Sequence, residues 1–491
     1  MEKQFTEKSF TFFTINFVIG VGFITTISQV LKISYWGYLV LLLAGFCVFG
    51  IALAYSRLAN TYNDHYGGSY SFARHIDDEV AKNKATRSKN KFLDNLVFFV
   101  GWNQFIQMPL LSAIAPLFLV DAIELIIPDR DQFPQYDLVM WITRGASIVL
   151  FIIIIAISTI GLKTNKKIIL IASSFKWFIL LLALIIMMVA VAKASSQPVM
   201  AVSLDQKLNV ISPRLIISNT LLFMYAFAGI EDVSSMVKDV KFKNFRKILL
   251  ISFAVIFSFY LIFFSLYLFL PNELKPQPNS NINISAIYTY GLGSAGVILF
   301  IIGFLCNDLS FKLFQSASTA RRVVPLAEDG YLPASLAKQN KNHEFRNAIV
   351  FTTIIILVSM VILWIIPSIM QNDNDKKDFF DGTIIACSTA LFIEDIITFS
   401  TAFVLEGKKR IPRIPVWEKI VYGLDLIAII FLLVLFYCPW IIGDTWGIKN
   451  TVAIVSYLVF VLFGFILKAW YHYNVSHLIK EKMRLKKTQK Q

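Results

Sequence analysis

The sequence predicts an all-α integral membrane protein with about twelve transmembrane helices. Three observations support this fold class. Of the 491 residues, 56% are hydrophobic and only 16% are charged, whereas about 25% are charged in soluble domains. Apolar runs recur along the whole chain, each close to the roughly twenty residues that cross a bilayer as a helix. Basic residues gather in alternate loops between these runs, which is typical of membrane proteins.

In chain order, the predicted spans cover approximately residues 10–31, 37–60, 92–120, 139–161, 168–192, 213–235, 248–270, 294–317, 348–370, 382–405, 421–442 and 452–473. No soluble domain of useful size fits between or beyond these spans. The N-terminus lacks a small-residue cleavage site and its first apolar run is long, so we expect no removable signal peptide. The chain is therefore predicted to cross the lipid bilayer many times.

The formal net charge of +14 suggests a nucleic-acid function, but the distribution of the charge argues against one. Basic residues concentrate in 82–91, 163–167, 238–247, 321–322, 408–410 and 480–490, whereas 121–131 and 373–378 are acidic or mixed. This alternation is the positive-inside pattern, which predicts that both termini lie in the cytoplasm and the spans in the cell membrane. We expect each basic segment, Arg321 and Arg322 included, to be a solvated loop that faces lipid headgroups.

Cysteine and histidine usage argues against metal, cofactor and enzyme chemistry. All four cysteines sit within apolar spans without C-x-x-C spacing, and the five histidines fall in loops or at span ends. No pattern of the P-loop type is present, which argues against a built-in ATPase. No nucleophile–base pair appears either, so we expect no catalytic residues. Energy for transport would then come from an ion or exchange gradient, or from a partner chain.

The first apolar span contains glycines where a simple membrane helix has no use for them. Gly20, Val21 and Gly22 lie near its middle, and each glycine weakens a helix interior by roughly 1 kcal/mol. Unwound backbone is tolerated inside a bilayer only where it is buried in protein or lines a cavity. The glycines therefore predict a broken helix and a substrate site near the membrane midplane.

The sixth span supports the same interpretation, because an apolar helix runs into Gly229 and then into Glu231 and Asp232. Carboxylates inside a span are costly and mark a cavity or an ion path. If both spans are broken, their half-helix N-termini aim N–H groups at one point, which suits a substrate carboxylate. Carbonyls freed near Ile19 and Ala226 would accept hydrogen bonds from its ammonium group. The alternative is that Glu231 and Asp232 merely end a helix at the membrane surface.

Four stretches carry a resemblance to a known family. They are the Gly20–Gly22 segment; residues 54–58 and 67–74 followed by 98–102; residues 161–165 with 174–177; and residues 320–333, Ala-Arg-Arg-Val-Val-Pro-Leu-Ala-Glu-Asp-Gly-Tyr-Leu-Pro. Together they resemble the amino acid–polyamine–organocation superfamily of secondary transporters.

The resemblance implies a LeuT-like core in which five helices are repeated in inverted orientation. The chain would then divide into a cytoplasmic N-terminus (1–9), a first repeat (10–192), a second repeat (193–405), two peripheral spans (406–474) and a basic cytoplasmic tail (475–491). The candidate substrate-binding residues are Ile19, Gly20, Val21, Gly22, Asn103, Tyr225, Ala226, Phe227 and Gly229. Similar antiporters place an aromatic gate at the position of Tyr225 and a proton-responsive carboxylate at that of Glu231.

Lys176 lies inside the fifth apolar span, between Phe175 and Trp177. A long lysine side chain near the end of a span can snorkel to the interface. In sodium-independent relatives, however, a lysine at the matching place resembles a stand-in for the sodium ion. We therefore expect a coupling role for Lys176, with interfacial anchoring as the alternative.

Other polar residues also lie inside spans. Asn103, Gln104 and Gln107 in the third span either line the pocket or join helices to one another. Asp308 and Lys312 in the eighth span are four residues apart, so they share a helix face and could pair.

Two features depart from the family pattern. Relatives usually carry paired glutamates and then a proline after the sixth span, whereas this chain has Lys238 and Asp239 without a proline. The cytoplasmic gate is therefore expected to be built differently. Glu394 and Asp395 in the tenth span are unusual for the family and receive no role.

The favoured function is secondary transport of amino acids by alternating access, by symport or exchange and without sodium. The expected partners are the small-molecule substrate, the lipid bilayer and, as a coupling ion, protons. A polyamine, other organic-amine or nucleobase carrier on the same scaffold is one alternative. A receptor or scaffold that transports nothing is another, but it would not explain the glycine breaks and the buried acids together.

Overall fold

The computed structural model describes residues 4–77, 88–124, 134–195, 212–271, 274, 284–369 and 373–488. Most of these residues are helical, and the described strands form one parallel pair, β1 (Phe5–Thr6) and β2 (Val240–Lys241). The α-helices are α1 (Glu7–Val18), α2 (Val21–Lys32), α3 (Gly37–Thr61), α4 (Ser69–Arg74), α6 (Lys91–Glu124), α7 (Tyr136–Ser158), α8 (Leu162–Ser195), α10 (Pro213–Phe227), α11 (Ile230–Ser234), α12 (Phe245–Leu268), α13 (Ile284–Leu292), α14 (Ser294–Glu328), α15 (Arg346–Ile369), α16 (Asp373–Gly407), α17 (Val416–Tyr437) and α18 (Ile448–Thr488). Short 3-10 helices cover Ser34–Trp36, Val237–Asp239, Ala334–Ala337 and Pro439–Ile442.

Within the described residues, 11 helices are long and apolar enough to cross a membrane. The first predicted span is missing from this set because it is broken into α1 and α2, which have 12 residues each. The sixth span is broken as well, into α10 and α11. The prediction of an all-α protein with many spans is therefore confirmed.

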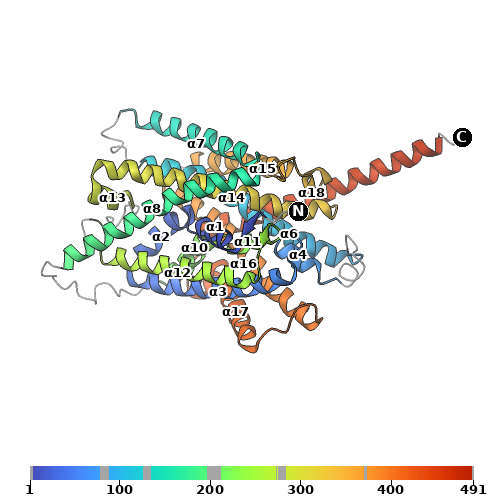
Figure 1. Cartoon of the computed structure of the whole chain (residues 1–491), viewed down its shortest axis with the longest axis horizontal. Helices are drawn as coiled ribbons and strands as arrows, with labels where there is room; N and C mark the ends of the chain where they lie inside the picture. Colours follow the sequence, from blue (N-terminus) through green and yellow to red (C-terminus); the bar gives the residue numbers. More distant parts are fainter. Residues whose placement is uncertain are drawn as a thin grey trace.

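The broken helices lie at the centre of the bundle (Figure 1). In the view of Figure 1, α7 and α17 lie on opposite edges, and the last part of α18 projects away from the other helices. The helix α10 packs against α2 and α3, while α14 packs against α8 and α6. Long helices thus surround four short ones, which puts both breaks in the interior of the protein.

One end of the bundle holds the strand pair, and we call it the β end. Phe5 is in register with Val240 and Thr6 with Lys241, and the Gln4 N–H donates a hydrogen bond of 2.8 Å to the carbonyl of Asp239. The half-helices α1 and α11 therefore lie on the β-end side of their breaks, because β1 leads into α1 and α11 leads toward β2.

The expectation that Arg321 and Arg322 lie in a solvated loop is wrong. The helix α14 continues to Glu328 instead of ending near residue 317, and both arginine side chains are buried with 1% exposure. The sequence pattern was misleading because buried acids from other elements pair with both guanidinium groups.

Candidate functional site

The first break separates α1 from α2 at Ile19 and Gly20. The Ile19 N–H still bonds to the carbonyl of Ile15 at 3.0 Å, but the backbone of Gly20 is extended, with φ −134° and ψ −152°. No side chain caps α2 at this residue. The break therefore exposes the N-terminus of a 12-residue helix inside the protein, where backbone N–H groups favour a negative charge.

The second break needs a glycine. Gly229 has φ +120°, a conformation that residues with a β-carbon rarely adopt. A β-carbon at this position would also lie 2.6 Å from the ring of Phe17 in α1. Gly229 thus allows the break in the sixth span to pack directly against the first span.

Two contacts bring the breaks together. A β-carbon on Gly22 would lie 2.9 Å from the carbonyl oxygen of Tyr225, so α2 and α10 touch at a point that only glycine fits. Tyr260 of α12 donates a hydrogen bond of 2.6 Å to the carbonyl of Ala226, and its hydroxyl lies 3.3 Å from the carbonyl of Val18. One tyrosine therefore satisfies the ends of both α10 and α1.

Lys176 lies at the end of α1. Its side chain is buried, with 2% exposure, whereas its neighbour Phe175 is 54% exposed. The ammonium Nζ donates a hydrogen bond of 2.6 Å to the carbonyl of Asn16, which the break leaves without its usual helical partner at residue 20. Lys176 therefore points into the protein and places a positive charge at the negative end of the α1 dipole.

A cavity adjoins the first break and Lys176. It is lined by Ile19, Gly20, Lys176 and Asn307, together with side chains from α2, α8, α12, α13 and α14. The hydroxyl of Tyr288 in α13 donates a 3.0 Å hydrogen bond to the carbonyl of Ile179 in α8. The rest of the lining is Phe23, Ile179, Leu180, Ala183, Phe263, Tyr288, Phe300, Gly303 and Phe304.

Tyr225, Ala226, Phe227 and Asn103, which are also predicted to bind substrate, do not line this cavity. Tyr225, Ala226 and Phe227 belong to the last turn of α10 beside the second break. Asn103 has no exposed surface; its amide donates to the carbonyl of Ala390 at 2.7 Å and accepts from the hydroxyl of Tyr457 at 2.9 Å. Asn103 thus joins three helices to one another. The side chain of Val21 lies outside the described residues.

The two acids of the sixth span are both buried. Glu231 accepts a hydrogen bond of 2.8 Å from the N–H of Gly229, so it braces the second break. Asp232 forms an ion pair with Arg322 of α14, and Arg322 also donates 2.7 Å to the carbonyl of Gln104. Exposures of 2% for Glu231 and 0% for Asp232 show that neither carboxylate lies on the protein surface.

Glu394 and Asp395 of α16 differ sharply in their surroundings. Glu394 accepts hydrogen bonds from Tyr55 at 2.7 Å, from Gln107 at 2.5 Å and from Ser69. Asp395 is completely buried, and neither of its carboxylate oxygens has a hydrogen-bond partner among the described residues. Glu394 therefore joins α3, α6 and α16 through a polar cluster.

Asp308 and Lys312 form the pair that their spacing suggested. Lys312 Nζ lies 2.6 Å from a carboxylate oxygen of Asp308, and both side chains are nearly buried. Lys312 also lies over the ring of Phe151 in α7, 5.4 Å from its centroid. This pair links α14 to α7 and does not line the cavity.

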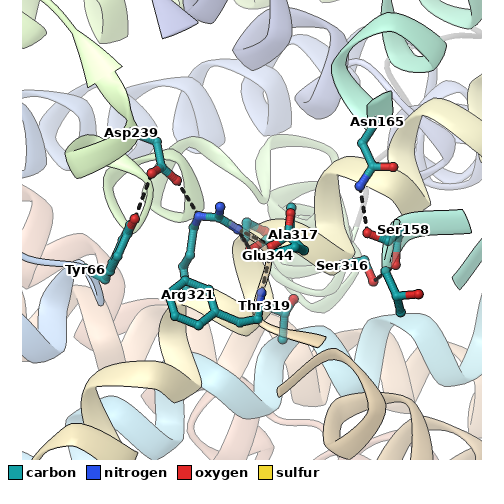
Figure 2. Close-up of polar contacts among 12 residues, drawn as sticks. Tyr66, Ser158, Asn165, Asp239, Ser316, Ala317, Thr319, Arg321 and Glu344 are labelled. Atoms are coloured by element: carbon teal, nitrogen blue, oxygen red, sulfur yellow. Dashed lines mark hydrogen bonds and ion pairs between the residues drawn. The ribbon is translucent and has the colours of Figure 1, made fainter. Parts of the chain in front are cut away.

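At the β end, Arg321 lies at the centre of a buried ionic network (Figure 2). It pairs with Asp239, and it donates 2.9 Å to Glu344 and 2.9 Å to the carbonyl of Ala317. Tyr66 donates 2.7 Å to the second oxygen of Asp239. Figure 2 shows Tyr66 and Arg321 approaching Asp239 from different sides, so one network joins four segments of the chain.

His75 lies near the same end, outside the spans. Its ring stacks on Tyr62, with centroids 4.2 Å apart, and its Nδ1 lies 2.6 Å from the carbonyl of Ser71. Burial lowers the pKa of His75 to about 4, despite the opposing effect of the Ser71 carbonyl. The imidazole is therefore neutral at physiological pH.

Tyr260 and Asn307 are the site residues that sequence reasoning missed. Tyr260 lies in a long apolar run that also holds Tyr267, and a tyrosine in such a run commonly serves packing. Asn307 precedes Asp308, and a neutral amide inside a span is a weaker functional signal than a carboxylate. Within the described ranges, no group of three His, Cys, Asp or Glu side chains gathers in a way that could hold a metal ion. The site offers helix ends, one ammonium and amides, which suit binding of a zwitterion.

Comparison with known proteins agrees with this geometry. The amino acid permease family matches residues 5–466. The chain is 32% identical to the uncharacterised protein MG225 of Mycoplasma genitalium over 98% of both chains. It is 30% identical to the uncharacterised protein MG226 of the same organism over 94% of both, and 31% identical to an MG226 homologue of Mycoplasma pneumoniae over 88% of both. The chain belongs to the amino acid permease family of the amino acid–polyamine–organocation superfamily.

Proposed function

We propose that the protein is a secondary active transporter that moves amino acids across the cell membrane by alternating access, without sodium. The observation that carries this proposal is the meeting of two helix breaks. Gly22 touches Tyr225 at this point, and Tyr260 contacts the carbonyls of Val18 and Ala226. Two broken spans in contact offer both N–H and carbonyl groups to one ligand, as a zwitterion requires.

The binding mode follows from the polarity of the first break. We propose that the substrate carboxylate binds at the N-terminus of α2, after Gly20. The carbonyls of Val18 and Ala226 already accept hydrogen bonds from Tyr260, and we propose that carbonyls at the breaks accept from the ammonium group through their second lone pairs. Tyr225 would act as the gate because its backbone and ring lie against Gly22.

Energy coupling is proposed for two buried ionisable residues. The ammonium of Lys176 occupies the end of α1, where a sodium ion would otherwise balance the helix dipole, so sodium has no place to bind there. Glu231 braces the second break through the N–H of Gly229. A proton that arrives at Glu231 would weaken that hydrogen bond, which links proton binding to the break.

The β end is proposed to face the cytoplasm, as the positive-inside pattern predicts. The two inverted repeats are proposed to cover 10–192 and 193–405, each beginning with a broken helix. A polyamine carrier is disfavoured because the described lining of the cavity contains Lys176 and no carboxylate. A scaffold without transport is disfavoured by the family to which the chain belongs.

The proposal is tested by exchange in proteoliposomes. The purified chain is reconstituted in vesicles loaded with unlabelled amino acids, and uptake of labelled amino acids is followed with and without sodium. We expect saturable exchange that does not depend on sodium. Exchange with polyamines alone would favour the amine carrier, and strict sodium dependence would remove the role of Lys176. Gly145→Ala should exchange like the parent protein, because nothing lies within 4 Å of a β-carbon at that position. It is the control for substitutions of the glycines at the breaks.

A further inference from the structure

The cavity beside the first break is strongly apolar. Among the described residues that line it, the polar side chains are Lys176, Asn307 and the hydroxyl-bearing Tyr288, and there is no carboxylate. Phenylalanine, isoleucine and leucine side chains supply most of the remaining wall: Phe23, Phe263, Phe300, Phe304, Ile179 and Leu180. Such a wall gains free energy from an apolar group in proportion to the area that it covers.

Two of these polar groups, Lys176 and Asn307, lie beside the break. Asn307 lines the cavity with only 3% exposure, and neither atom of its amide has a hydrogen-bond partner among the described residues. A β-carbon on Gly20 would lie 3.8 Å from the amide oxygen of Asn307, so the amide faces the N-terminus of α2. A buried amide without partners is costly, and this one is positioned to donate to a carboxylate or accept from an ammonium group.

The remainder of the lining extends away from this polar point. Along α8 it includes Lys176, Ile179, Leu180 and Ala183, residues that share one helix face at three- and four-residue spacing. The direction of α8 carries this face away from the β end, toward α13. Tyr288 of α13 closes it by bonding to the carbonyl of Ile179. The cavity therefore has a polar base at the break and an apolar body.

We propose that the transported amino acid has an apolar side chain, which occupies this cavity when its wall widens from the present volume of about 30 Å³, while Asn307 and the N-terminus of α2 hold its carboxylate and ammonium groups. The inference rests on the proposed function and names its substrate class. A cationic side chain would face the ammonium of Lys176 without a carboxylate to pair with, and burial of an unpaired charge is strongly unfavourable. An anionic side chain could reach Lys176, which already donates to the carbonyl of Asn16, but the rest of the wall that would desolvate it is almost entirely apolar.

The first test measures binding of labelled leucine to the purified full chain, with competition by phenylalanine, alanine, arginine, glutamate and spermidine. We expect leucine or phenylalanine to bind at least roughly tenfold more tightly than alanine, since each buried methylene adds severalfold. Tighter binding of arginine, glutamate or spermidine would overturn the apolar substrate while leaving a transporter in place. No binding by any amino acid would overturn the proposed function itself.

The second test changes the shape of the cavity. Phe304→Ala enlarges its wall, so the ratio of tryptophan to leucine affinity should rise by roughly tenfold. Ala183→Phe fills it, so leucine binding should fall by at least roughly tenfold while alanine binding persists. Ile298→Ala is the control on α14, because Ile298 is 60% exposed and does not line the cavity.

A third variant separates the polar base from the apolar body. Asn307→Leu should weaken binding of leucine and alanine alike, because it removes the group that holds their common backbone atoms. If Phe304→Ala and Ala183→Phe leave the preference for side-chain size unchanged in correctly folded protein, the side chain binds elsewhere and the proposal is wrong.

Discussion

The ammonium of Lys176 donates a 2.6 Å hydrogen bond to the carbonyl of Asn16, one turn before the break in the first span. Asn16 is in α1 and Lys176 in α8, so a side chain of the fifth span completes the end of the first. This contact and the 2% exposure of the lysine side chain place its ammonium inside the protein and away from the membrane interface.

Replacement of Lys176 by methionine keeps much of its volume and removes its charge, so the loss of packing should be modest. We expect Lys176→Met to fold but to lose pH-dependent uptake in proteoliposomes, with exchange impaired less than net accumulation. Lys163→Met, at an exposed position near the start of the same helix, should behave like the parent protein. An unaltered pH profile in Lys176→Met would show that this lysine does not couple transport to protons.

Gly22 leaves no room for a side chain against Tyr225. We expect Gly22→Ala to reduce substrate binding at least roughly tenfold, and Gly22→Val to abolish it, since the added carbons push α2 away from α10 and spoil the alignment of the site. Both variants should still insert and purify. Equilibrium binding of labelled amino acid checks this, with Gly145→Ala as the unaffected control. Wild-type affinity in Gly22→Val would move the site elsewhere.

Arg321 neutralises two buried acids, Asp239 and Glu344. Removal of one partner from a buried ionic network typically costs roughly 3–5 kcal/mol, because a charge is left uncompensated. Arg321→Met should therefore lower the thermal unfolding midpoint clearly, and adding Glu344→Gln should restore part of the loss. Arg346→Met, at an exposed position, serves as the control. Equal midpoints for Arg321→Met and Arg346→Met would contradict the prediction.

His75 should make stability depend on pH. Burial lowers its pKa to about 4 in the folded protein, against about 6.5 in an unfolded chain. The unfolded state therefore binds more protons between these values, so stability is lost as pH falls from about 6.5 toward about 4. His75 is only partly buried, and we expect a contribution on the order of 1–2 kcal/mol.

The measurement is the thermal midpoint in detergent between pH 7 and pH 4, compared for the parent protein and His75→Phe. Phenylalanine keeps a ring against Tyr62 but cannot titrate. The drop on acidification should be smaller in the variant. A drop of the same size in both proteins would assign the acid sensitivity to other groups.

The breaks in the first and sixth spans could be predicted because glycine inside an apolar run has a local cause that sequence alone displays. Gly20, Gly22 and Gly229 indicate the breaks from the local sequence, so the positions of neighbouring helices are not needed to predict them. The inward orientation of Lys176 was an open alternative in the sequence and needed the position of Asn16 to decide it. The local sequence thus predicts where the helices end, whereas tertiary packing determines which side chains bond to the backbone carbonyls at those ends.

Contacts between distant segments could not be predicted from the sequence. The role of Tyr260 depends on α12 packing beside two helix ends that lie far apart in the chain. Arg321 looked like part of a basic loop because its acidic partners come from residues 82 positions before it and 23 after it. When the partner of a charged residue is far away in the sequence, the residues next to that charge give no indication that it is paired.

The strand pair at the β end has a mechanical consequence. Phe5 pairs with Val240 just before α1 and just after α11, so the β-end halves of both broken spans share a two-stranded ribbon. Hydrogen bonds between strands resist sliding of one strand along the other, hence a displacement of either half-helix pulls on the other. The strand pair therefore couples the positions of α1 and α11, and a flexible insertion between Thr6 and Glu7 would let the two half-helices move independently.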